Sequence, residues 1–354
     1  MINSFANFIW LTNRFWGGIP RDDPKGCLLC TGGKTVGKYI VRRIVFQGIP
    51  VLLGFTLLLY FVITIAPGSP VNHLRGIPDL DPEVLEARKA QLGLNDSFMA
   101  QYLRWLGQVL QGDLGYSFDS ARRPVADLIK ERMAATILLS SVSIIIAWLI
   151  GVPVGIFSAR RQYSIFDYVL TFFAFVGISI PSFFFGLVLL YVFALKLDWF
   201  PAGGFFLAGE THTFLGYVRY LTLPALTLGL GTIASITRYM RASLLEVLPQ
   251  DFLRTAKAKG LKEKTVVYKH ALRNALIPIL TLVGFMIPSI FSGAVIVENI
   301  FAWPGLGSLA IQAVNERNYP VMMGINLMFA ILIFLGSLIA DLSYALADPR
   351  IRYE

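Results

Sequence analysis

Long apolar stretches alternate with polar segments along this chain, and each stretch predicts a membrane-spanning helix. An α-helix needs about 20 mostly apolar residues to cross a bilayer, and these stretches reach that length. The expected fold class is therefore an all-α polytopic membrane protein with six transmembrane helices. The expected spans cover residues 39–66, 133–157, 168–195, 220–239, 275–300 and 321–345.

The polar segments divide the chain around these spans. The longest of them has apolar residues at helical spacing between Phe98 and Leu110, which predicts a helical insertion between the first two spans. The aromatic residues near the N-terminus suit an interfacial helix. The expected regions are an N-terminal extension (1–38), the first span (39–66), the insertion (67–132), a core (133–345) that includes a basic loop (241–274), and a tail (346–354).

Composition and charge support a membrane protein with a defined orientation. Of the residues, 55% are hydrophobic and only 15% are charged, far from an average soluble domain. The net charge of +9 gathers at the ends of apolar stretches, mainly over residues 34–43 and 238–273. The positive-inside rule then places both termini and the basic loop in the cytoplasm and the insertion outside. This topology explains the charge better than nucleic-acid binding does, so no nucleic acid is expected as a partner.

The sequence offers no convincing metal, nucleotide or catalytic site. Cys27 and Cys30 have metal-ligand spacing, but no further ligands lie nearby. Residues 32–38 have Walker A spacing, but Tyr39 replaces the Ser or Thr that would hold magnesium. Ionisable residues are absent from the cores of the expected spans, which disfavours an ion-driven carrier. We therefore expect this chain to have no catalytic residues and to bind no cofactor or metal.

Small residues and prolines predict two local structures. Gly151 and Gly155 lie four residues apart within the second expected span, a spacing that allows close helix packing. After the fifth span, Pro304, Gly305 and Gly307 predict a tight chain reversal. Trp303, in the same segment, suits the membrane interface.

The basic loop contains the most informative segment, residues 246–278. Pro249 interrupts the preceding helix, Asp251 can cap a new one, and Gly260 can end it in a left-handed conformation. The expected helix, residues 252–259, is too short to be stable alone in water. The residues expected to form its buried face, Phe252, Leu253 and Ala256, would bury little area. We therefore expect this helix to dock on another structure.

The same segment resembles the EAA loop of ABC importer permeases. Arg254, Thr255, Ala256 and Gly260 occupy the positions of the family's Glu-Ala-Ala-x-x-x-Gly pattern, and Arg-Thr-Ala-Lys-Ala-Lys-Gly-Leu is the form typical of the dipeptide/oligopeptide/nickel branch. Residues 298–307, 347–353 and phrases of the insertion also resemble that branch. The chain thus resembles its inner-membrane permease subunits, which have the type I ABC importer permease fold.

This resemblance implies function, partners and site residues. It implies that the chain forms half of a translocation path for di- or oligopeptides in the bacterial cytoplasmic membrane. The alternative cargoes of such a complex are nickel and oligosaccharides. The alternative class of protein is an ion-driven secondary transporter. The implied partners are a second permease subunit, two ATPase subunits that bind ATP and Mg²⁺, an external solute-binding protein and the lipid bilayer. The implied ATPase-coupling residues are Glu246, Asp251, Phe252, Leu253, Arg254, Thr255, Ala256, Lys257, Lys259, Gly260 and Leu261. The implied external gate comprises Glu298, Trp303, Pro304, Gly305 and Gly307, and the candidate path-lining residues are Ser289, Ser292 and Gly293.

Overall fold

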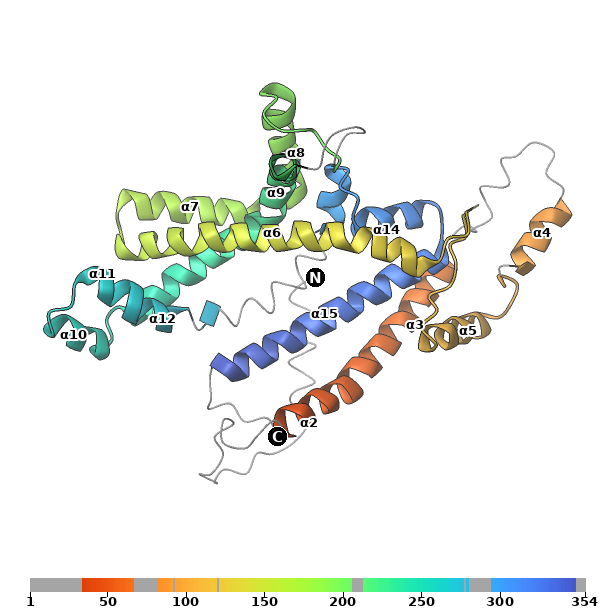
Figure 1. Cartoon of the computed structure of the whole chain (residues 1–354), viewed down its shortest axis with the longest axis horizontal. Helices are drawn as coiled ribbons and strands as arrows, with labels where there is room; N and C mark the ends of the chain where they lie inside the picture. Colours follow the sequence, from red (N-terminus) through yellow and green to blue (C-terminus); the bar gives the residue numbers. More distant parts are fainter. Residues whose placement is uncertain are drawn as a thin grey trace.

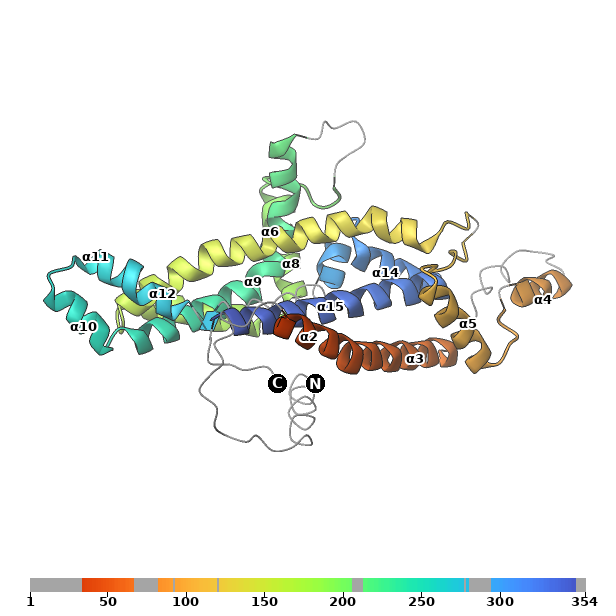
Figure 2. The same cartoon turned by 60° about the horizontal axis from the view of Figure 1, so that its bottom comes forward.

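The protein is an elongated bundle of helices (Figures 1 and 2). The computed structural model describes residues 34–66, 82–91, 93–119, 121–205, 213–276, 278–279 and 294–347. Within these ranges the only β-type pairing is an isolated bridge between Tyr116 and Pro124, so the described part is all-α. Cys27, Cys30 and most of the N-terminal extension lie outside the described residues, as does the tail from residue 348 onward.

The described residues form a series of α-helices with three π-helical turns. The first half contains α2 (Lys34–Arg43), the π-helical turn η1 (Ile44–Gly48), α3 (Ile49–Ile65), α4 (Pro82–Gln91), α5 (Phe98–Leu110), α6 (Val125–Arg160), α7 (Ile165–Ser179), α8 (Ser182–Leu189) and η3 (Leu190–Lys196). The second half contains α9 (Phe214–Val247), α10 (Asp251–Ala258), α11 (Glu263–Thr265), η4 (Val266–Ala271), α12 (Leu272–Ala275), α14 (Leu306–Asn315) and α15 (Tyr319–Ala347).

Among the described residues, four helices are long and apolar enough to cross a membrane: Tyr39–Ile65, Val125–Arg160, Phe214–Val247 and Tyr319–Ile339. They confirm the expected first, second, fourth and sixth apolar helices, and the chain is a multi-pass membrane protein. Most of the expected fifth span, residues 275–300, lies outside the described residues.

The expected third span, residues 168–195, is two helices in the structure, which together are long and apolar enough to cross a membrane once. The structure breaks it between Ser179 and Ser182, where the helices on either side meet at 107°. Pro181 causes the break, since it has no N–H to continue the helix and it forces the preceding residue out of helical geometry. Ile180 is accordingly extended, with φ −75° and ψ 127°. Segment α8–η3 projects from the bundle as a result (Figures 1 and 2).

Helices α6 and α9 form the centre of the bundle and approach each other closely at Gly151 and Gly155, as the glycine spacing predicts. A Cβ atom at Gly151 would lie 2.8 Å from Ile236 Cγ2, and one at Gly155 would lie 2.6 Å from Met240 Cβ. Neither distance is compatible with a side chain, so the two glycines set the separation between α6 and α9.

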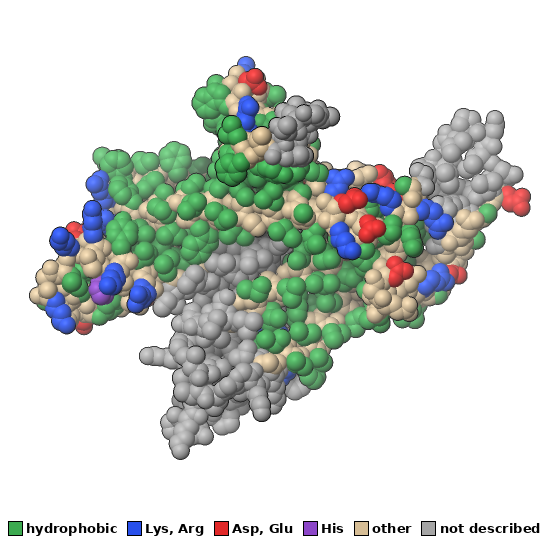
Figure 3. Space-filling view, in the orientation of Figure 1, with side chains coloured by type: hydrophobic (Ala, Val, Ile, Leu, Met, Phe, Trp, Pro, Cys, Tyr) green, Lys and Arg blue, Asp and Glu red, His purple; other side chains and the backbone are tan. Residues whose placement is uncertain are grey.

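Buried side chains form separate clusters along the length of the bundle. One cluster joins α6 and α9 to α10 and η4 at one end, a second joins α6, α8 and α9 near the middle, and others join α14, α15, α3 and α5 at the opposite end. Lys, Arg and His side chains gather at the α10 end, while both signs of charge appear at the opposite end (Figure 3). The surface between the two ends is mostly hydrophobic (Figure 3).

Candidate functional site

The short helix α10 lies at the extreme basic end of the bundle (Figure 1). It begins at Asp251, with Gln250 as the N-cap residue and no side-chain capping bond. The expectation that Asp251 caps the helix is therefore wrong: Asp251 is the first helical residue, where its negative charge suits the helix dipole. Gly260 follows the helix with φ +76°, the left-handed conformation expected of it.

The chain itself anchors α10 through Leu253 and Ala256. Leu253 is fully buried and Ala256 nearly so. The cluster that holds them includes Met240 and Leu244 of α9 and Val266 of η4. Of the implied coupling residues, Leu253 and Ala256 therefore face the chain itself, because α9 and η4 cover this face of α10.

The part of α10 that α9 and η4 leave uncovered is exposed and basic. Phe252 leaves 40% of its surface accessible, so of the three apolar candidates only Phe252 faces outward. Arg254 makes one exposed ion pair of 3.5 Å with Asp251, which is worth little in water. The other expected coupling residues, Glu246, Thr255, Lys257, Lys259, Gly260 and Leu261, are also exposed. This face therefore presents one aromatic ring among positive charges.

An ion pair that the sequence did not predict joins α7 to α9 at this end of the bundle. Asp167 at the start of α7 accepts hydrogen bonds from Arg241 of α9, with Nε to Oδ1 at 2.7 Å and Nη2 to Oδ2 at 2.8 Å. Ser158 Oγ and the backbone N–H of Tyr163 donate to the same carboxylate. The one sequence signal is Ser164 three residues before Asp167, a capping pattern at the start of a helix.

Two further contacts connect the α10 segment to the long helices. Arg160, the last residue of α6, donates to Glu263 of α11 at 3.1 Å. Ser243 Oγ of α9 donates to the carbonyl oxygen of Ala275 in α12 at 2.9 Å, and this bond is buried. The segment from α10 to α12 is therefore attached to α6 and α9 through packing, an ion pair and a hydrogen bond.

At the opposite end, Glu298 organises the turn that leads into α14. Its carboxylate is fully buried and accepts hydrogen bonds from Thr136 Oγ1 at 2.6 Å and from the backbone N–H groups of Gly307 and Ser308 at 2.6 and 3.1 Å. Thr136 in turn accepts from the backbone N–H of Leu306 at 2.7 Å. These bonds fix the start of α14 against α6.

The glycines of this turn are required by space, since a Cβ atom at Gly305 would lie 2.2 Å from Glu298 Oε1 and one at Gly307 would lie 2.4 Å from Val295 Cα. The left-handed residue of the reversal is Ala302, with φ 48°. Trp303 is fully buried and its Nε1–H donates to the carbonyl oxygen of Ala135 at 3.0 Å. Trp303 is therefore covered by the chain itself, and α6 supplies the partner for its N–H.

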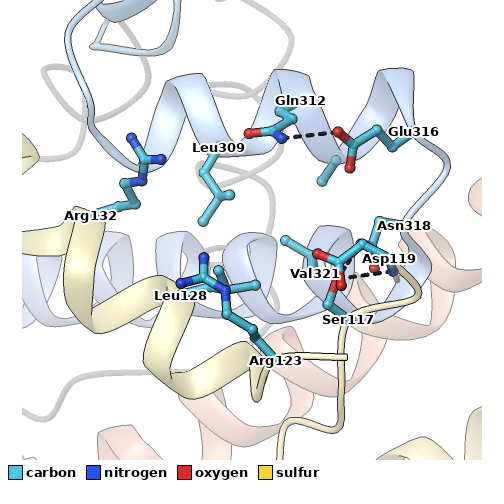
Figure 4. Close-up of a pocket in the computed structure, with 11 residues that line it drawn as sticks. Ser117, Asp119, Arg123, Leu128, Arg132, Leu309, Gln312, Glu316, Asn318 and Val321 are labelled. Atoms are coloured by element: carbon cyan, nitrogen blue, oxygen red, sulfur yellow. Dashed lines mark hydrogen bonds between the residues drawn. The ribbon is translucent and has the colours of Figure 1, made fainter. Parts of the chain in front are cut away.

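A shallow polar recess of about 100 Å³ lies beside this turn, between α6, α14 and α15 (Figure 4). Arg132 of α6 lines it together with Arg123 and Asp119 of the segment before α6, while Glu316 lines it from α14 (Figure 4). The amide of Gln312 donates to Glu316 at 2.9 Å. The recess therefore presents charges of both signs on the end of the molecule opposite α10.

Three candidate path-lining residues, Ser289, Ser292 and Gly293, lie outside the described residues. Within the described ranges, no group of three or more His, Cys, Asp and Glu side chains has the arrangement of a metal site.

The bundle, with the short helix α10 at one end, is that of an all-α, multi-pass membrane protein with the type I ABC importer permease fold. The chain belongs to the family described as "Binding-protein-dependent transport system inner membrane component", whose sequence model matches residues 151–353. A companion model for the N-terminal part of such membrane components matches residues 36–140.

Relatives with assigned names include peptide permeases. The chain is 45% identical over 319 residues to the oligopeptide transport system permease protein AppB of Bacillus subtilis, an alignment that covers 89% of this chain and 99% of that protein. It is 37% identical over 338 residues to the dipeptide transport system permease protein DppB of Escherichia coli K12, covering 90% and 99% of the two chains.

A solved structure shows the same fold. The MetNI methionine ABC transporter in an inward-facing conformation contains a chain that superposes with a TM-score of 0.51 at 18% identity, covering 62% of this chain and 96% of that chain. At this identity the likeness concerns the fold alone.

Proposed function

We propose that this chain is one of two permease subunits of an ATP-driven importer and forms half of a path for di- or oligopeptides. A second permease subunit completes the path, two ATP-binding subunits bind ATP and Mg²⁺ and supply the energy, and an external binding protein delivers the cargo. This chain itself is neither an enzyme nor a cofactor-binding protein in this scheme. The names of its relatives favour peptides over nickel or oligosaccharides.

The observation that carries the proposal is the arrangement of α10. Leu253 and Ala256 fix the helix to the chain, while Phe252 and the surrounding Lys and Arg side chains face outward. An exposed aromatic ring beside positive charges suits docking on a partner with an apolar groove and an acidic rim. In the proposed function, Phe252 enters a groove of the ATPase subunit, and Arg254, Lys257 and Lys259 contact its acidic rim.

The anchoring contacts explain how movement would reach the membrane. Leu253 packs on α9, and Arg160 joins α11 to α6. Helices α6 and α9 are in turn in close contact at Gly151 and Gly155. A displacement of α10 by the ATPase would therefore shift α6 and α9 together rather than move a loose loop.

The opposite end of the bundle would face the external binding protein. Glu298 holds α14 in place, and the recess beside it offers both signs of charge for polar contacts. Pro304, Gly305 and Gly307 belong to the same turn and would form part of an external gate. This orientation places the basic α10 end in the cytoplasm of a bacterial cell and follows the positive-inside rule.

An ion-driven carrier is the second candidate from a different class, and the two candidates predict different assemblies. The chain, purified in mild detergent, should retain two ATPase subunits and a second permease. In liposomes, the complex should take up labelled peptide only with ATP and the binding protein. Uptake by this chain alone, driven by an ion gradient without ATP, would overturn the proposal.

The role of α10 can be tested with a matched pair of substitutions. Phe252→Asn removes the exposed ring of α10, and Tyr163→Asn removes an exposed ring on the α6–α7 turn, also outside the core. We expect Phe252→Asn to lower peptide uptake and release the ATPase, with Tyr163→Asn close to wild type. Equal effects of the two changes would contradict docking through α10.

A further inference from the structure

Helix α5 carries apolar side chains over nearly half of its circumference but packs only part of them against the chain. With 3.6 residues per turn, its apolar residues form two adjacent rows, each about 60° wide. The first row contains Phe98, Tyr102, Trp105 and Val109, and the second contains Met99, Leu103, Leu106 and Leu110.

The first row attaches α5 to the spans. Tyr102 and Trp105 are buried against Met323 of α15 and Tyr60 of α3. The hydroxyl groups of Tyr102 and Thr56 lie 3.1 Å apart in a buried hydrogen bond. The position of α5 on the bundle is therefore well defined.

The second row, which we call the α5 stripe (Met99, Leu103, Leu106 and Leu110), is left largely uncovered. Met99 is 51% exposed, Leu103 56% and Leu110 79%. The polar residues of α5 lie on a different side of the helix, where Arg104 forms an ion pair with Asp96. Leu106, at the edge of the α5 stripe, packs partly against the cluster around Tyr102 and Trp105. The stripe contains no charge, and Met99, Leu103 and Leu110 remain exposed on it.

The apolar side of α5 meets the exposed apolar surface of a membrane span through Phe98, the first-row residue next to Met99 of the α5 stripe. The rings of Phe98 and Phe61 meet edge to face with their centres 5.8 Å apart, and Phe61 is itself half exposed on α3. Leu58, Val62 and Ile65 of α3 are also more than half exposed. One uncovered apolar surface therefore extends from the span onto α5.

The level of α5 along the bundle corresponds to the polar boundary of the spans. Met323 of α15 contacts α5, while Val321 and Ile325, on either side of it, pack on the first turns of α6. On those turns Lys130 and Glu131 are exposed. The same level also holds several tyrosine and tryptophan rings, which are typical of membrane–water interfaces. They are Tyr60, Tyr102, Trp105 and Tyr319.

We propose that α5 is an interfacial anchor, which lies in the membrane–water interface with the α5 stripe in contact with lipid acyl chains. The occupant is lipid because the apolar side of α5, which carries the stripe, adjoins the exposed face of a span through Phe98 and Phe61. A water-soluble partner would have to enter the hydrocarbon layer to cover it. A helix with one apolar and one polar face is suited to this position. The inference rests on the membrane location of the chain and not on its cargo.

The test uses the complete transporter complex in lipid nanodiscs, with Cys27 and Cys30 replaced by Ser. A nitroxide label is attached to Leu103→Cys on the α5 stripe or to Gln108→Cys on the polar side of the same helix. Its exposure to oxygen, which concentrates in lipid, is compared with its exposure to a water-soluble chromium complex. We expect the oxygen-to-chromium accessibility ratio to be at least severalfold higher at residue 103 than at residue 108.

Two results would overturn the proposal. Equal ratios at the two positions would show that the α5 stripe faces water. A label at residue 103 that is shielded from both reagents, especially when the binding protein is added, would show that a protein covers it. Peptide uptake by the same samples is measured separately, so a failure of the proposed cargo would leave this result unchanged.

Discussion

Glu298 and Gly307 are joined by a hydrogen bond of 2.6 Å, from the backbone N–H of Gly307 to Oε2 of the glutamate. The same oxygen accepts from the backbone of Ser308, and Oε1 accepts from Thr136 of α6. One buried carboxylate thus connects two helices and the turn between a span and α14. It holds α14 on the bundle together with the apolar packing of Leu306 and Leu309.

Replacing Glu298 with Ala should destabilise the protein strongly. The change leaves two backbone N–H groups and the Thr136 hydroxyl without their acceptor, and each unsatisfied buried group costs about 1–3 kcal/mol. Glu298→Gln keeps one acceptor oxygen and the shape of the side chain, so we expect a smaller loss. Thermal unfolding of the purified complex measures both. Equal losses would contradict the assigned hydrogen bonds.

Gly307→Ala should be harmful although the change is small. The new Cβ atom would meet Val295 Cα at 2.4 Å, and a backbone atom cannot move aside as a flexible side chain can. Overpacking of this kind costs about 1–3 kcal/mol. Gly54→Ala on α3 is the control, because no atom lies within 4 Å of its Cβ position. The yield of folded complex should fall for the first variant only; a comparable fall for Gly54→Ala would refute the steric explanation.

Asp167 and Arg241 should show strong energetic coupling. The Asp167 side chain is almost fully buried, and breaking a buried ion pair by removing one partner costs about 3–5 kcal/mol. We expect Asp167→Asn and Arg241→Gln each to lower the unfolding temperature, and the double variant to lose less than the sum. A double-mutant cycle on the purified complex measures the coupling. Simple additivity would show that the two residues act independently.

Gly260→Val should impair coupling between ATP hydrolysis and uptake. Gly260 has φ +76° with open space around it, so only the backbone conformation opposes a side chain, at a cost of about 1–2 kcal/mol. Valine should therefore displace the end of α10, whereas Gly260→Asn should be better tolerated because Asn adopts this conformation more readily. The measurement is peptide transported per ATP hydrolysed. Val and Asn variants with the same ratio would argue against a role for this conformation.

Local chemistry allowed the sequence to predict α10 closely. The expected residues 252–259 differ by one position from the observed Asp251–Ala258, because Pro249 and Gly260 limit the helix from either side. The face that α10 buries could not be predicted in the same way. Leu253 and Phe252 are both apolar, and only the positions of α9 and η4 determine that Leu253 is covered and Phe252 is exposed.

The same distinction applies to the rest of the chain. Apolar length alone identified the long membrane helices and the class of protein, because a bilayer requires about 20 apolar residues in a row. Contacts between distant residues decided the rest: Glu298 with Thr136, Asp167 with Arg241, and Trp303 with Ala135. The pattern of apolar and polar residues indicates whether a segment is surrounded by lipid or by water. The partner of a buried polar group depends instead on which helices the folded chain brings together.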